Sequence, residues 1–165
     1  MILSSPLNPL IYMSIKVALG AKACNETVIS LRGNANKEAI YAYQASSNKK
    51  NTTIYKVNSS GKLAWKEGNK LRGSVRQTEY LPEGIAILTD ETSGKNRESK
   101  IYFLDANSGV DLWKKAPKTK GLISHFYTEK DGIIFGVATG GINRIKFNGT
   151  PLWKKPLKTG PQIST

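Results

Sequence analysis

The chain has 165 residues, 39% of them hydrophobic, which is enough to bury the core of one ordinary domain. Its formal net charge is +13, and such an excess of Lys and Arg favours polyanions such as nucleic acid, acidic lipid or anionic polysaccharide. A single cysteine, Cys24, excludes an internal disulfide and a metal site of several cysteines. The lone His125 lacks a cysteine or second histidine partner, so we expect it to be structural.

The N-terminal segment, residues 1–25, contains the pattern of a strand. Residues 7–19 are apolar, but Lys16 interrupts them and the run is too short to span a membrane. No Lys or Arg precedes the run, unlike a secretory signal. Apolar side chains alternate from Ile11 to Leu19, which is typical of a half-buried strand. We expect this segment to be a strand of a preceding repeat unit, or a leader.

Three tryptophans mark an internal repeat. Each has a glycine four residues before it, and a Lys directly after it. The tryptophans are 48 and 40 residues apart, close to the roughly 40–45 residues of one propeller blade of the WD40 kind. The repeated residues are Gly61 and Trp65, Gly109 and Trp113, and Gly149 and Trp153.

Each repeat unit divides into four short pieces rich in Ile, Val, Tyr and Phe, bounded by Gly, Asn, Asp and Ser, which is typical of strands and turns. We predict units at 26–70, 71–120 and 121–157, with 158–165 starting a fourth. The tryptophan is expected in the last strand of each unit, and residues 91–99 in a long hairpin loop. The predicted strands are 26–32, 38–44, 52–58 and 62–66; 71–80, 84–90, 100–106 and 110–115; and 122–128, 133–138, 142–147 and 151–155.

The segment 104–115 contains Asp105, Gly109 and Trp113 in the pattern xDxxxGxxxW. It resembles the repeat of the pyrroloquinoline-quinone-type (PQQ-like) β-propellers. Counting back from each tryptophan, Val57 and Ile145 occupy the Asp position in the other units. The resemblance implies an all-β fold: an incomplete β-propeller of about three four-stranded antiparallel blades. It also implies that each tryptophan docks between blades, near a turn glycine.

Enzymes of that family use a calcium ion, a catalytic Asp and often a disulfide of adjacent cysteines. This chain has no cysteine pair, and its acidic residues do not have calcium-loop spacing. No catalytic or metal-binding residue is therefore carried over, and no cofactor is expected; PQQ is considered only for a longer parent protein. The sequence favours a non-enzymatic scaffold or binding module and leaves enzymatic activity open.

Three kinds of partner remain under consideration. A protein, or the missing blades of the same propeller, fits the scaffold hypothesis; an anionic polymer fits the net charge; and a quinone fits the alternative of a dehydrogenase fragment. No small-molecule substrate is identifiable. Residues 154–165 repeat 114–125, so we interpret the chain as a piece of a longer array that would self-associate or be poorly stable alone. The resemblance implies a cell-envelope location, periplasmic or extracellular.

Overall fold

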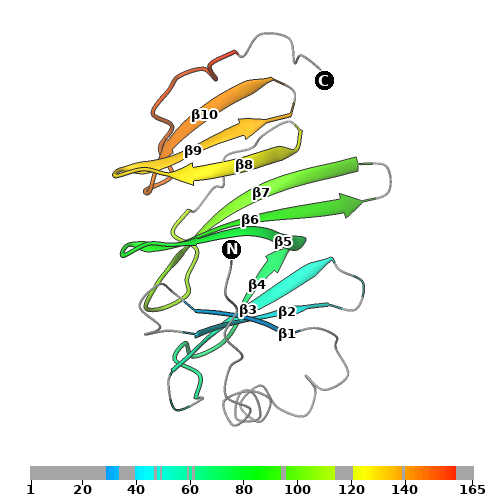
Figure 1. The fold of residues 1–165 in the computed structure, drawn as a ribbon, viewed down its shortest axis with the longest axis vertical. Coiled ribbons are helices and arrows are strands. Elements are labelled where there is room, and N and C mark those ends of the chain that lie inside the picture. The colour runs from blue at the N-terminus through cyan, green and yellow to red at the C-terminus, as the bar shows by residue number, and fades with distance from the viewer. Residues whose placement is uncertain are drawn as a thin grey trace, which may run out of the picture. The chain divides into compact units, whose positions relative to one another are not determined.

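The computed structural model shows an all-β chain (Figure 1). Ten strands are present in the described part, and no helix there is long and apolar enough to cross a membrane. The strand expected within residues 11–19 lies outside the described residues. The chain forms two compact units, 1–70 and 71–165. The structure describes residues 29–33 (backbone only), 40–46, 48, 50–58, 60, 62–93, 96–113, 121–138 and 140–158.

The first sheet has four strands in the order β1-β2-β3-β4. Its register places Gly33 opposite Ile40, and Ile40 opposite Val57. Ala42 and Val57 form the centre of a small core, against which Ile40, Tyr55 and Leu63 pack. The strands are β1 (Ile29–Gly33), β2 (Ile40–Ala45), β3 (Asn51–Val57) and β4 (Asn69–Arg72).

The second and third sheets share one hydrophobic core. The second has the order β5-β6-β7 and the third β10-β9-β8, all antiparallel, and β8 contacts each strand of the second sheet. Apolar side chains from both sheets meet there, led by Phe103, Phe126 and Phe135, and their burial is the main force joining the sheets. The strands are β5 (Ser74–Tyr80), β6 (Gly84–Ser93), β7 (Asn96–Asp105), β8 (Ile123–Thr128), β9 (Gly132–Val137) and β10 (Gly141–Lys146).

The long loop predicted at 91–99 is wrong. Strands β6 and β7 stay paired out to Ser93 opposite Asn96, so these polar residues extend a hairpin rather than leave it. The sequence is polar because the hairpin end is exposed: Thr92, Arg97 and Glu98 all face solvent. Strands pair through backbone hydrogen bonds and need no apolar side chains for this. A polar composition therefore does not distinguish a loop from an exposed hairpin end.

The predicted continuous fourth strands are also wrong in detail. Segments 62–66, 110–115 and 151–155 each contribute one isolated bridge within the described residues, through Leu63, Asp111 and Pro151, before the chain bends at the tryptophan. Pairing resumes four residues later, at β4 in the first sheet and at Leu157 in the third, whose N and O bond Ile142 at 2.9 Å. Because of this bend, the tryptophan lies outside the hydrogen-bonded strand ladder of its own sheet.

Strand β4 lies at the junction of the predicted units 26–70 and 71–120, because it runs from Asn69 to Arg72. The start of the second sheet is set by Gly73, whose φ of 86° turns the chain between β4 and β5.

Candidate interaction site

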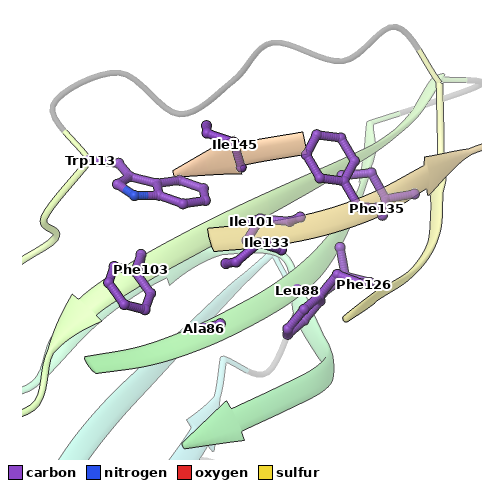
Figure 2. Packing of buried hydrophobic residues seen from close by; sticks show 10 residues of the cluster. Ala86, Leu88, Ile101, Phe103, Trp113, Phe126, Ile133, Phe135 and Ile145 are labelled. Carbon is purple, nitrogen blue, oxygen red and sulfur yellow. The ribbon is translucent and has the colours of Figure 1, made fainter. Parts of the chain in front are cut away.

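Trp113 packs on the turn that follows β10 in the third sheet. Its side chain is 3% exposed, and its Nε1 donates a hydrogen bond of 2.7 Å to the carbonyl oxygen of Phe147. A Cβ on Gly149 would lie 3.3 Å from Cδ1 of Trp113, so glycine permits this close approach. Phe103 flanks the indole, with ring centroids 5.9 Å apart (Figure 2). The tryptophan thus locks one sheet to the turn of the next.

The turn itself is held by a side-chain oxygen. Asp105 Oδ1 accepts hydrogen bonds from the backbone N of Asn107 (3.0 Å) and of Ser108 (2.7 Å), and from Ser108 Oγ (2.7 Å). Gly109 follows with φ 75° and donates its N–H to the Asp105 carbonyl at 2.9 Å. The repeat Asp and Gly therefore shape the loop, which is a structural role.

The equivalent of Asp105 in the first sheet is Asn58, not Val57. Asn58 Oδ1 accepts bonds from Ser60 N (3.1 Å), Ser60 Oγ (2.7 Å) and Lys62 N (2.9 Å), so like Asp105 it accepts three bonds from the turn that it begins. Asn58 N bonds Lys62 O, whereas Asp105 N bonds Val110 O, so the second turn is one residue longer.

The third sheet shows the same one-residue shift. Lys146 N bonds Thr150 O, so Lys146 rather than Ile145 begins that turn, and Asn148 Oδ1 accepts the N–H of Thr150 at 3.0 Å. Counting back a fixed number of residues from each tryptophan places the start of these two turns one residue too early. The Asn residues already present in the turn sequences were the signal that could have revealed it.

A second contact joins β5 to β8 through polar side chains. Gln77 Nε2 donates to the carbonyl of Phe126 at 2.7 Å, and Gln77 Oε1 accepts from the N–H of Phe126 at 3.1 Å. The side-chain amide of Gln77 thus bonds the backbone of Phe126 in the way that a paired strand would. Beside it, Thr128 Oγ1 donates to Glu79 Oε2 at 2.5 Å. These bonds order the first strands of the two sheets relative to each other.

The third sheet repeats these positions. Strands β5 and β8 carry a register shift at the same place, and each ends in an equivalent turn, Leu81 to Gly84 and Glu129 to Gly132. This correspondence puts His125 at the position of Gln77, and Tyr127 at that of Glu79. His125 is exposed, and Tyr127 is 69% exposed.

Trp153 repeats the position of Trp113, yet 36% of it is exposed. We call His125, Tyr127 and Trp153 the open face. Gln77, Glu79 and Trp113, at the same three positions of the second sheet, contact the third sheet. The sequence predicts a repeat position for Trp153 but only a structural role for His125, because the bulges that align His125 with Gln77 are not visible in composition.

The other predicted repeat residues behave differently. Trp65 is 2% exposed and lies 5.8 Å, centroid to centroid, from the ring of Tyr41 within the first unit. Gly61 lies outside the described residues. The structure therefore brings Trp113 and Gly149 together, and places Asp105 and Gly109 in the turn one sheet earlier.

Charges near the site are mostly peripheral. Arg144 pairs with Glu129 at 2.6 Å and Asp131 at 3.0 Å, at the β8–β9 hairpin. Burial raises the pKa of Asp111, while hydrogen bonds from the backbone of Trp113 and Phe103 and the charge of Lys100 act in the opposite direction. Among the described residues, no cluster of three His, Cys, Asp or Glu side chains could hold a metal ion.

Comparison with known proteins identifies the fold. No family model and no curated protein matches the chain. A computationally designed protein, Ika8, matches 77% of it with a TM-score of 0.53 and 14% identity, and BamB from Moraxella catarrhalis matches 83% with a TM-score of 0.50 and 16% identity. The fold is a partial β-propeller. The chain spans 36% and 40% of those two proteins. We refer to each of its sheets below as a blade.

Proposed function

We propose that the chain is a non-enzymatic β-propeller scaffold whose blades present a protein-binding surface. The observation that carries this proposal is the open face of the third blade, which offers a tyrosine, a tryptophan and a histidine. Exposed Tyr and Trp are enriched at binding hot spots, because they supply large rigid contact area. The turn residues of the repeat, by contrast, are occupied in shaping loops.

The PQQ-like repeat pattern supports a finer version of this proposal. In it, the chain belongs to a PQQ-like repeat protein of the cell envelope and binds no quinone itself. The similarity to BamB supports the fold, and the xDxxxGxxxW segment at Asp105, Gly109 and Trp113 supports the family. A quinone-dependent dehydrogenase fragment is the alternative within the same family.

Site-specific photo-cross-linking tests the scaffold proposal. A benzophenone amino acid replaces Tyr127 in one variant and Lys130, exposed in the turn between β8 and β9, in the control. We expect a discrete cross-linked protein, identified by mass spectrometry, from position 127 only. Equal products from both positions, or spectral binding of the quinone with calcium, would contradict the proposal.

An anionic-polymer binder is a second candidate, favoured by exposed cations beside the third tryptophan. Lys154, Lys155 and Lys158 are all exposed there. Binding to a heparin oligosaccharide should weaken steeply with salt, because each neutralised anion releases a counterion. Replacing the three lysines by Gln should reduce the slope of log K against log salt, whereas Lys50→Gln, far along the sequence, serves as the control. Affinity that is flat in salt removes this candidate.

A further inference from the structure

One asparagine of the chain is followed directly by a glycine, and it lies in the turn that receives Trp113. This residue is Asn148, and it is exposed. In an Asn–Gly pair the side-chain amide is lost readily, because glycine has no Cβ to hinder the approach of its backbone nitrogen to the asparagine Cγ. No other asparagine in the sequence precedes a glycine. Sequence and exposure therefore both select Asn148 for this chemistry.

Two hydrogen bonds of the folded turn oppose the reaction. The nitrogen of Gly149 is the nucleophile, and its N–H donates to the Lys146 carbonyl at 2.8 Å. Oδ1 of Asn148 accepts the N–H of Thr150 at 3.0 Å, which directs the side chain toward Thr150. Both bonds must break before the Gly149 nitrogen can reach Cγ. The reaction rate therefore follows the fraction of time for which the turn is open.

The second sheet keeps this turn closed. Trp113 Nε1 donates a 2.7 Å bond to the carbonyl of Phe147, directly before Asn148, and the indole packs on Gly149, directly after it. The Phe147 ring also stacks on Phe103, with ring centroids 5.1 Å apart. Contacts with the second sheet thus flank Asn148 on both sides. Docking of the indole and loss of the amide are therefore coupled.

We propose that Asn148 is a site of spontaneous modification, at which the side-chain amide is converted to isoaspartate when the turn opens. The Gly149 nitrogen forms a bond to the Asn148 Cγ and gives up its proton, while the bond from Cγ to Nδ2 breaks and ammonia leaves. Water then opens the five-membered ring at either of its two carbonyl carbons, which gives aspartate or isoaspartate. Water is the only other reactant, so the conversion proceeds whatever the chain binds.

The two products differ in what they do to Trp113. Aspartate keeps an oxygen that accepts the Thr150 N–H, and it leaves the backbone unchanged. Isoaspartate carries the main chain through its former side chain, which adds one carbon between the Phe147 carbonyl and the Gly149 nitrogen. The indole contacts Phe147 and Gly149 together, so the changed spacing releases it. Modification of Asn148 thereby unlocks the second sheet from the third.

Peptide mass spectrometry on the full wild-type chain, aged at neutral pH, tests the proposal without a variant. We expect conversion at Asn148 before conversion at Asn107 or Asn58, which are exposed in turns but precede serine. Unfolding in urea should speed conversion at Asn148 about tenfold or more, because it removes both restraining hydrogen bonds. Earlier conversion at Asn107 or Asn58, or equal rates at Asn148 in the folded and unfolded chain, overturns the proposal.

Trp113→Phe tests the coupling to the docked indole. The variant keeps an aromatic ring but loses the Nε1–H bond to Phe147, so conversion at Asn148 should be about fivefold faster, the factor expected for one ordinary hydrogen bond. Trp65→Phe is the matched control, because Trp65 is buried in the other compact unit, and it should leave the rate unchanged. Equal rates in both variants contradict the coupling. If circular dichroism shows that W113F is unfolded, the urea comparison on the wild type decides.

The effect of modification on docking is measured on the products. Ion exchange separates the modified chain, which has gained a negative charge. Its Trp113 indole N–H should exchange with solvent about tenfold faster than in the unmodified chain, because the carbonyl that accepts its bond has moved. Asn148→Asp supplies the aspartyl product alone and should exchange like wild type. Slow exchange in the modified chain, or fast exchange in N148D, contradicts release of the indole by isoaspartate.

Discussion

Trp113 and Trp153 occupy the same repeat position but differ in what covers them. Trp113 is 3% exposed and donates a 2.7 Å hydrogen bond to the Phe147 carbonyl, whereas Trp153 is 36% exposed. Both follow a turn glycine by four residues and precede two lysines. The difference shows that the tryptophan motif supplies one side of a contact, and that the other side is a turn in another part of the chain. The burial of Trp113 comes from the third sheet, through the turn at Phe147 and Gly149.

The largest expected effect comes from removing the covered indole. Trp113→Ala should destabilise residues 71–165 by about 3–5 kcal/mol, since it leaves a cavity between two blades and an unpaired carbonyl at Phe147. Trp153→Ala should cost less than about 1 kcal/mol in the monomer. Urea unfolding followed by circular dichroism measures both. Equal losses would show that the two indoles are in equivalent surroundings.

The next effect concerns the turn that receives Trp113. Gly149 has φ 84°, and a Cβ there would lie 3.3 Å from the indole. Gly149→Ala should therefore cost about 1–3 kcal/mol, from left-handed backbone strain and a displaced ring. Gly136→Ala is the matched control, because its Cβ would meet only the Ser124 hydroxyl, which can rotate. A loss in the control as large as in G149A would break the docking argument.

Gln77 and His125 allow the same comparison at the first strands. Gln77→Ala leaves the N–H and carbonyl of Phe126 without their side-chain partner, at a cost of about 1–3 kcal/mol. His125→Ala removes an exposed side chain at the equivalent position and should change stability by less than about 0.5 kcal/mol. Thermal unfolding of both variants at a concentration where the chain is monomeric gives the answer. A larger loss in H125A would mean that the open face is already covered.

The smallest effect depends on pH. Burial raises the pKa of Asp111 above its ordinary value of 3.8, so the folded state holds that proton more tightly than the unfolded state. The contribution to stability is full below the unfolded pKa and is lost as pH rises through the folded pKa. Asp111→Asn, which keeps an acceptor for the Trp113 N–H, should therefore match or exceed wild type at neutral pH. The difference should shrink as pH falls below about 4, measured by urea midpoints. A variant that is less stable at neutral pH contradicts this account.

Much of the fold was predictable because the repeat is local. Strand segments, turn glycines and the tryptophan period follow from apolar alternation and from Asn and Gly in tight turns, and the expected all-β partial propeller is confirmed. The extension of strands β6 and β7 into residues 91–99 was not predicted, because a polar hairpin end and a loop have the same composition. The interrupted fourth strands were missed because Trp65 and Trp153 sit in segments that also favour strands.

The candidate site was only half predictable. Trp153 could be found from its spacing, but its exposure could not, since burial depends on a neighbouring blade. His125 and Tyr127 join it only through bulges that shift β5 and β8 alike, and a bulge has no sequence signature here. The role of Asn58 was hidden by a turn that is one residue shorter than that at Asp105.

Hydrogen exchange of the tryptophan indole N–H groups tests the central claim most directly. Trp→Phe variants assign the three NMR signals. We predict slow exchange at Trp113, whose Nε1–H is bonded to Phe147, fast exchange at Trp153, and faster exchange at Trp113 once Gly149 is replaced by Ala. Exchange at Trp113 as fast as at Trp153 would contradict the claim that the Trp113 indole is locked by the turn at Phe147 and Gly149.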